Sequence, residues 1–171
     1  MPQVSTSLGL LPMRTAAGSD LATLIALLRE AQAWMDQHRL GQWVPGAHDP
    51  SRIEAMIHRR EVYVVERDAQ VIAVFALTSE LPGHWPPHPD PFGYLSTLTV
   101  ARDFAAQGIG AALIAWAEAL LRDQRKRWSC LDCYGKNPRL RAYYERLGYV
   151  ALGEVETYPG YPERMFRKRL T

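Results

Sequence analysis

Apolar and polar residues follow two periods along this chain, and the changes between them mark predicted helices and strands. Runs rich in β-branched and aromatic residues predict strands, whereas apolar residues that recur every three or four positions predict helices. The predicted strands are residues 10–14, 61–66, 70–77, 94–100, 128–134, 149–155 and 164–170. The predicted helices begin after Ser19, at Pro50 or Ser51, after a glycine turn near residue 108, and at Asn137. The predicted order is strand, two helices, three strands, helix, strand, helix and two final strands.

Local signals support several of these boundaries. Ser19 is a residue type that caps helices, and Asn137 followed by Pro138 combines a cap with a proline at the first helical position. Gly148 stands where a helix commonly ends in a left-handed residue. The third helix should bury one apolar stripe, formed by Ile109, Ala112, Leu113, Trp116 and Leu120.

Length and composition favour one domain over residues 1–171, with residues 1–8 as a flexible tail. The 171 residues are 47% hydrophobic, which is enough to bury a core without metal or disulfide support. Residues 81–91 are rich in proline, which cannot donate to a sheet ladder, so they should form an exposed loop.

The charge balance gives no reason to expect nucleic acid or a membrane as a partner. Twenty basic and eighteen acidic residues leave a net charge of +2. No apolar run approaches the roughly 20 residues of a membrane span, and no basic residue precedes the weak apolar cluster at residues 8–11. We therefore expect a cytoplasmic protein.

Cys130 and Cys133 have the spacing of a redox pair or half of a zinc site. The segment around them reads as a strand, however, and residues three apart on a strand face opposite sides of a sheet. No second cysteine pair accompanies them, so we expect two unconnected thiols and no metal.

Residues 98–113 join an extended apolar segment to a long amphipathic helix through a turn that contains Gly108 and Gly110. The glycines let the backbone approach a ligand, and the first N–H groups of the helix have no internal partner, so the turn can hold a phosphate or pyrophosphate. A dinucleotide fingerprint would need a small residue where Leu113 stands. A nucleotide-triphosphate loop would need Gly-Lys-Ser/Thr, whereas Ala111 follows Gly110. A glycine pair before a helix also occurs in ordinary turns.

Two segments together carry a family resemblance. Residues 105–110, Ala-Ala-Gln-Gly-Ile-Gly, resemble the acyl-coenzyme A loop of the GNAT superfamily of N-acyltransferases, Gln/Arg-x-x-Gly-x-Gly/Ala, with Ala105 in place of the long polar side chain. Residues 137–149 resemble the same family's signature Asn…Tyr-Glu-x-x-Gly-Phe/Tyr. The predicted order of elements also matches the family over nearly the whole chain.

The resemblance implies an α/β (α+β) GNAT-like fold. Its centre would be a mostly antiparallel, six- to seven-stranded mixed sheet, splayed between the fourth and fifth strands and flanked by about four helices. Acetyl-coenzyme A would be the co-substrate. The residues implied to bind it are Leu98, Thr99 and Val100 along the pantetheine, Gln107, Gly108, Ile109, Gly110, Ala111 and Ala112 at the pyrophosphate, and Asn137.

The resemblance places Tyr144 beside the thioester sulfur as general acid. A phenol has an ordinary pKa of about 10, so it is protonated at neutral pH and can donate to a departing thiolate. The spacing of Leu140, Tyr143, Tyr144 and Leu147 is also that of a buried helix face, so without the resemblance both tyrosines would be read as core. With it, Tyr143 is the packing residue.

The general base stays open. Many family members carry a glutamate on the fourth strand, where this chain offers only tyrosine, serine and threonine. The candidates from neighbouring segments are Glu80, His84, His88 and Asp132. His84 and His88 also have a metal-like spacing, but a proline-rich loop without a paired acidic ligand favours ordinary loop residues. The aromatic candidates for an acceptor pocket are Trp34, Trp43, Trp85 and Phe92.

The leading hypothesis is an N-acetyltransferase that moves the acetyl group of acetyl-coenzyme A to a primary amine on a small molecule or peptide by direct attack. The alternatives are transfer of a larger acyl group such as succinyl or propionyl, a non-catalytic coenzyme A-binding or regulatory module, and a purely structural α/β domain. The acceptor is not fixed by the sequence, and the resemblance also allows a homodimer.

Overall fold

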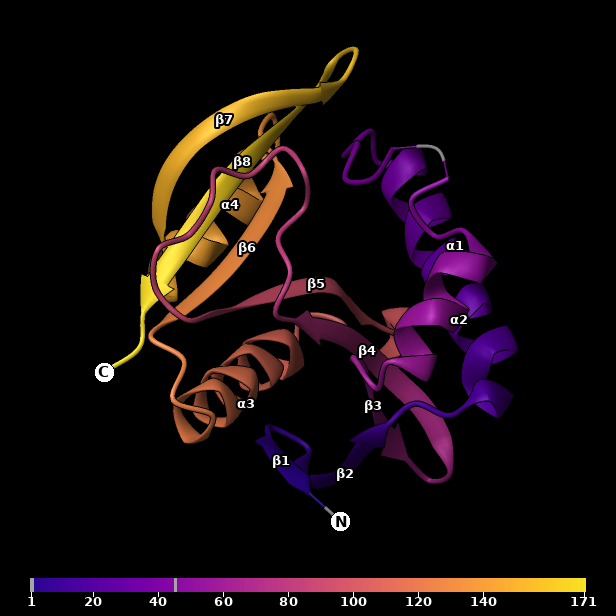
Figure 1. The fold of residues 1–171 in the computed structure, drawn as a ribbon. Coiled ribbons are helices and arrows are strands. Elements are labelled where there is room, and N and C mark those ends of the chain that lie inside the picture. Colours follow the sequence, from indigo (N-terminus) through magenta and orange to yellow (C-terminus); the bar gives the residue numbers. More distant parts are fainter. Residues whose placement is uncertain (1, 45) are drawn as a thin grey trace.

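One sheet of eight strands organises the computed structural model, which describes residues 2–44 and 46–171 (Figure 1). Its spatial order is β1-β2-β3-β4-β5-β6-β8-β7, and every neighbouring pair is antiparallel except β5 and β6. The strands are β1 (Gln3–Thr6), β2 (Gly9–Thr15), β3 (Val62–Arg67), β4 (Gln70–Thr78), β5 (Phe92–Val100), β6 (Trp128–Tyr134), β7 (Val150–Tyr158) and β8 (Tyr161–Arg169). The α-helices are α1 (Leu21–Gln37), α2 (Pro50–His58), α3 (Ile109–Asp123) and α4 (Pro138–Arg146).

The helices cover the sheet from both faces. Alternate residues of β4 belong to different hydrophobic clusters: Val74 packs with the cluster of α1 and α2, whereas Phe75 packs with the cluster of α3 and α4. This alternation follows from the two-residue period of a strand. It confirms the predicted mixed sheet flanked by four helices.

The expectation of a flexible tail at residues 1–8 is wrong for residues 2–8, and residue 1 lies outside the described residues. β1 pairs antiparallel with β2, and its Val4 side chain is only 2% exposed in the core cluster that contains α3. A tight hairpin makes the pairing, because Gly9 adopts a φ of 93° and the Thr6 hydroxyl donates to its carbonyl at 2.9 Å. The sheet therefore has one strand more than the six to seven expected.

The predicted cap of the first helix is also wrong. Ser19 lies inside a short 3₁₀ turn before α1, and it is the Asp20 carboxylate that accepts a backbone hydrogen bond, from Ala17 at 2.7 Å. Asp20 also receives two hydrogen bonds from Arg14, at 2.6 and 2.9 Å. The Arg14 guanidinium extends to Glu66 at 2.6 Å, so the charge network fixes the start of α1 to β2 and β3.

The last helix begins and ends as predicted. The Asn137 side chain accepts a hydrogen bond from the Leu140 N–H at 3.1 Å, Pro138 follows at the first helical position, and Gly148 has a φ of 88°. In α3 the predicted stripe is shifted around the helix, because Ile114, Ala117 and Leu121 are buried whereas Leu120 is only partly so. Ile109 and Leu113 are buried as expected.

The β5–β6 pairing is short. Only three residue pairs connect the strands, from Phe92 opposite Trp128 to Tyr94 opposite Cys130, and beyond them β5 and β6 diverge (Figure 1). The predicted splay between the fourth and fifth strands of the expected order is therefore present. It opens the sheet between its two halves.

No helix of residues 2–44 and 46–171 combines the length and apolar character that a membrane crossing would need.

Gly93, in the middle of the short β5–β6 pairing, provides a stability test. A Cβ at this position would lie 2.2 Å from Cδ2 of the buried Leu121 of α3. Gly93→Ala should therefore lower the free energy of unfolding by about 1–3 kcal/mol through overpacking, measured by urea denaturation. Gly18→Ala is the control, because its new methyl group would meet open space. Equal stability of the two variants would contradict the packing described.

Candidate functional site

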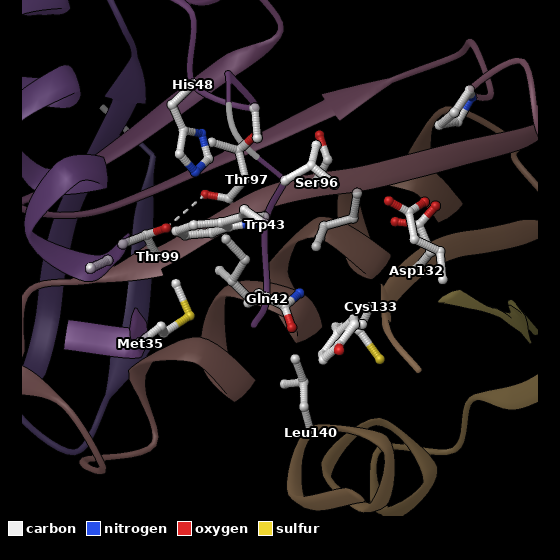
Figure 2. A pocket seen from close by; sticks show the side chains of 18 of the residues that line it. Met35, Gln42, Trp43, His48, Ser96, Thr97, Thr99, Asp132, Cys133 and Leu140 are labelled. Carbon is white, nitrogen blue, oxygen red and sulfur yellow. Dashed lines mark hydrogen bonds between the residues drawn. The ribbon is translucent and has the colours of Figure 1, made fainter. Parts of the chain in front are cut away.

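A cavity of about 600 Å³ opens where β5 and β6 diverge (Figure 2). Its walls come from β5 residues 94–100, α1, the α1–α2 connection, β6, α4 and the β7–β8 hairpin. The size is typical of ligand sites. Five of the residues expected to bind the coenzyme or to act as the general acid line it, namely Leu98, Thr99, Val100, Gly110 and Tyr144.

A β-bulge shapes the β5 wall of the cavity. The β4–β5 register passes from Ala76 opposite Ser96 to Val74 opposite Thr99, which leaves Thr97 and Leu98 without Cα partners in β4. Thr97 adopts a φ of 59°, and its carbonyl accepts a hydrogen bond from the Thr99 hydroxyl at 3.2 Å (Figure 2). Bulges redirect a strand and free backbone groups from the ladder. The backbone of this segment is thus available to an extended ligand.

The glycine turn has the backbone geometry of an anion site. Ala106 and Gly108 have φ values of 60° and 74°, and α3 begins immediately afterwards with Ile109. The first N–H groups of a 15-residue helix therefore point out of the turn. At Gly110, which lines the cavity, an added Cβ would lie 3.2 Å from the Tyr143 hydroxyl, so a side chain would crowd this wall.

Other predicted residues near the turn act through their backbone or are already engaged. The Ile109 side chain is buried in the core, so only its main chain can meet a ligand. The Gln107 carbonyl accepts a hydrogen bond from the Ser7 hydroxyl at 2.5 Å, which anchors the turn to the β1–β2 hairpin. Asn137 does not line the cavity, and its side-chain oxygen caps α4.

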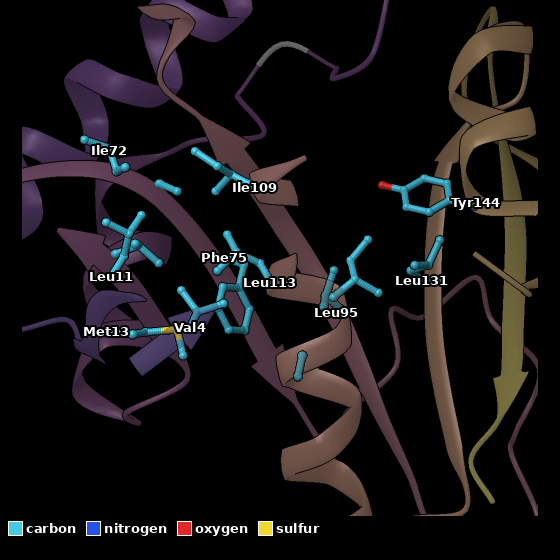
Figure 3. Close-up of a cluster of buried hydrophobic side chains, with 14 of the residues drawn as sticks. Val4, Leu11, Met13, Ile72, Phe75, Leu95, Ile109, Leu113, Leu131 and Tyr144 are labelled. Carbon is cyan, nitrogen blue, oxygen red and sulfur yellow. The ribbon is translucent and has the colours of Figure 1, made fainter. Parts of the chain in front are cut away.

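Tyr144 lies on the cavity side of α4, and the residue is 7% exposed. It packs against Tyr149 and Phe166 in the core. Figure 3 shows Tyr144 beside Leu131 of β6. Burial raises the pKa of the Tyr144 phenol well above its ordinary value, so the hydroxyl stays protonated. The neighbouring Tyr143 is less buried and also lines the cavity, next to Gly110.

A polar cluster forms another part of the cavity wall. His84 Nε2 lies 3.2 Å from Asp132 Oδ2 and 3.0 Å from Glu163 Oε2. The Asp132 carboxylate also accepts hydrogen bonds from the Trp85 indole at 2.8 Å and from the Tyr94 hydroxyl at 2.9 Å. These donors hold Asp132 in place on β6, and His84 joins it from the proline-rich loop.

The cluster can exchange a proton. The hydrogen bond to Asp132 raises the pKa of His84, and partial burial opposes that effect. Burial, followed by the nearby charge of Asp132, raises the pKa of Glu163. His84, Asp132 and Glu163 have ligand atoms within 4.8 Å of one another, so the arrangement also has the composition of a cation site.

Of the four candidates for a general base, two line the cavity and two do not. His84 and Asp132 meet at the cavity, whereas His88 packs between Phe92 and Trp128 outside its lining. Glu80 borders a smaller recess near Arg59 and Glu61. The geometry therefore leaves His84 and Asp132 as the members of the set that face the cavity.

Glu163 was not among the residues singled out in the sequence. It reaches the cluster because β8 pairs with β6, where Tyr134 lies opposite Glu163 and Asp132 opposite Met165. Only knowledge of this register could have placed its carboxylate beside the Asp132 carboxylate. The local sequence around Glu163 carries no such signal.

Two of the four expected aromatic residues line the cavity, namely Trp34 of α1 and Trp43 of the α1–α2 connection. Trp85 and Phe92 instead pack in a separate cluster with Tyr94 and Cys130. Trp85 still contributes indirectly, through its hydrogen bond to Asp132.

Cys130 and Cys133 are free, buried and members of different hydrophobic clusters, as expected for opposite faces of a strand. Burial raises the pKa of each thiol to about 12. Cys133 lines the cavity beside Tyr144, where it remains a neutral thiol.

The chain resembles known acetyltransferases in sequence. The model of the acetyltransferase (GNAT) family matches residues 26–149. The Bacillus subtilis (strain 168) protein YesJ, an uncharacterized N-acetyltransferase, is 29% identical over 165 residues, covering 91% of this chain and 88% of that protein. The S-(2-succino)cysteine N-acetyltransferase of the same organism is 32% identical over 162 residues, covering 92% of this chain and 94% of that protein.

Solved structures share the fold. A GNAT-family acetyltransferase from Listeria monocytogenes 4b F2365 has a TM-score of 0.83 at 22% identity, covering 99% of this chain and 100% of that one. The paia N-acetyltransferase of Thermoplasma acidophilum, solved in complex with coenzyme A, has a TM-score of 0.72 at 16% identity, covering 93% and 98%. With the family model spanning most of the sequence, the chain belongs to the GNAT family of acetyltransferases.

Proposed function

We propose that this acetyltransferase moves the acetyl group of acetyl-coenzyme A to a primary amine by direct attack, without a covalent enzyme intermediate. One observation supports this most strongly. A helix N-terminus with a glycine turn, a buried phenol and a proton-accepting cluster line the same cavity. Direct transfer requires a site that binds the coenzyme, an acid that protonates the leaving sulfur and a base that takes a proton from the amine.

The residues present fit the coenzyme. The backbone of Gln107, Gly108, Ile109, Gly110, Ala111 and Ala112 would surround the pyrophosphate. The N–H groups up to Ala111 would donate to it, because the Ala112 N–H already donates to the Gly108 carbonyl at 3.1 Å. The redirected backbone of Leu98, Thr99 and Val100 would pair with the amides of the pantetheine arm. Ala105 offers the same main-chain groups as the long polar residue it replaces. Asn137 would act by capping the helix that carries Tyr144.

Tyr144 would serve as the general acid. The acetyl group reaches the amine as a carbon–nitrogen bond forms and the carbon–sulfur bond breaks. A thiolate then needs a proton or a strong hydrogen bond, and a neutral buried phenol can supply either. The raised pKa keeps Tyr144 in the donating form throughout the neutral range.

His84 would serve as the general base. An amine is largely protonated at neutral pH, so a group at the cavity must take a proton before or during attack. His84 faces the cavity with Nε2 between two carboxylates, which stabilise the imidazolium that forms. Asp132 and Glu163 would position the ring and stabilise its positive charge.

Acetyl is favoured over a larger acyl group by the names of both Bacillus relatives, which are N-acetyltransferases. A non-catalytic module is disfavoured because the acid and the base cluster face the same cavity.

Tyr144→Phe should lower kcat by about 100-fold, because it removes only the donating hydroxyl. The Kd for acetyl-coenzyme A should stay near the native value, since the ring still packs in the core. Thiol release would be measured in steady state with a reactive amine, and Kd by calorimetry. Tyr143→Phe is the matched control and should lose far less turnover. Native kcat in Tyr144→Phe would rule out the acid role.

Asp132→Asn should move the acidic limb of the kcat/KM profile to lower pH. Asp132 is the largest cause of the raised pKa of His84, so without its charge the imidazole loses its proton more readily. The base is then in its neutral form at lower pH. The measurement is kcat/KM against pH with one amine for all variants, so that the titration of the amine is common to them.

Glu80→Gln is the control for this profile, because Glu80 lies outside the cavity lining. The acidic limb of its kcat/KM profile should lie at the same pH as that of the native enzyme. An unmoved limb in Asp132→Asn would show that His84 is not the titrating base.

A further inference from the structure

The α1–α2 side of the cavity carries polar groups that the transfer chemistry does not use. Gln42, Trp43 and His48 of the α1–α2 connection and Arg52 of α2 line this side. Figure 2 shows Gln42, Trp43 and His48 projecting into the same space as Asp132. Because the proposed transfer chemistry gives these residues no role, they are available to contact the acceptor molecule.

Gln42 and His48 lack hydrogen-bond partners within residues 2–44 and 46–171. The Gln42 Oε1 atom and both ring nitrogens of His48 are buried and unpaired there. Burial and the nearby Arg52 charge lower the pKa of His48 to about 4, so the ring is neutral at pH 7 and offers one donor and one acceptor. Unpaired buried polar groups are costly, and a polar ligand would satisfy them.

Arg52 is a cation without an anionic partner. Across the described part of the chain no carboxylate lies within 4.0 Å of its guanidinium, and its one side-chain hydrogen bond is a long one to the Ala47 carbonyl, at 3.4 Å. The residue is exposed while lining the cavity, which places it at the mouth. Arg52 and Glu163 both line this cavity, Arg52 from α2 and Glu163 from β8.

The cavity therefore carries negative charge on one side and positive charge on another. Asp132 and Glu163 attract a positive ammonium group at the reacting end, and Arg52 attracts an anion at the mouth. The other cation of the lining, Arg102, stacks 3.7 Å above the Trp34 ring and follows directly after the β5 segment assigned to the coenzyme. Arg52 is thus the cation on the acceptor side.

We propose that the acceptor is an amino acid or a close analogue, with its carboxylate bound by Arg52 and its amino group turned toward His84, Asp132 and Glu163. This inference rests on the proposed N-acetyltransfer. Guanidinium is suited to this task because it binds carboxylates through paired, charge-assisted hydrogen bonds. Gln42 and His48 would complete the polar contacts of the bound molecule.

The test uses acceptor pairs that differ only in the carboxylate: L-leucine with isopentylamine, L-methionine with 3-(methylthio)propylamine, and L-phenylalanine with phenethylamine. Thiol release from acetyl-coenzyme A gives kcat/KM for each. Values are compared per unit of unprotonated amine, because loss of the carboxylate also raises the amine pKa. The native enzyme should prefer the amino acid in at least one pair by about tenfold or more.

Arg52→Gln should lower kcat/KM for that amino acid by about 10- to 100-fold, mainly through KM, and leave its decarboxylated partner nearly unchanged. Arg52→Lys should recover part of the loss, because it restores charge without the paired geometry. Arg102→Gln is the matched control. It removes a cavity cation at the coenzyme end and should leave the ratio within each pair unaltered.

The outcomes separate the two proposals. Native preference for the decarboxylated amines, or an equal loss for both members of a pair in Arg52→Gln, would overturn the acceptor class while acetyl transfer itself stands. No transfer to any member of the panel by protein that binds acetyl-coenzyme A would contradict the proposed function, and the acceptor class with it.

Discussion

The rest of the site depends on the fact that β5 and β6 stop pairing after a few residues. Their pairing is the parallel contact in an otherwise antiparallel sheet, and only three residue pairs hold it. Packing at Gly93 against Leu121 brings the strands together at one end. Beyond that point each strand has a neighbour on one side only, so the opened edges of β5 and β6 become the walls of a cavity.

The splay also explains why the functional groups come from distant parts of the chain. The glycine turn and the bulged strand belong to the half built from β1–β5 and α3. Tyr144 and Asp132 belong to the half built from β6–β8 and α4, and Glu163 joins them because β8 pairs with β6. His84 crosses between the halves on the proline-rich loop. A ligand between β5 and β6 therefore touches both halves.

The charges of His84, Asp132 and Glu163 partly offset one another. Two partly buried carboxylates near each other would repel, and a protonated His84 between them relieves that repulsion. Removal of the proton from His84 restores the repulsion, so the cluster favours taking a proton from an incoming ammonium group. Arg52, which makes no ion pair within residues 2–44 and 46–171, adds a positive charge on another side of the same cavity.

Features with local backbone signatures could be predicted from the sequence. The glycine turn, the Asn137-Pro138 start of α4 and the left-handed Gly148 depend on a few adjacent residues, and the structure contains all three. Features that depend on pairing at long range were missed. β1 has a single deeply buried residue, Val4, which is too little for a periodic pattern, and Glu163 reaches the site only through the β6–β8 register.

The most direct test of the coenzyme site is amide hydrogen exchange with and without saturating coenzyme A. Slower exchange in residues 98–100 and 107–112 would support it, because these backbone amides would be bound or covered. The same protection should be lost in Gly110→Asp, whose carboxylate would repel the pyrophosphate. Unchanged exchange in both segments, or protection confined to other parts of the chain, would contradict the placement of the coenzyme between β5 and β6.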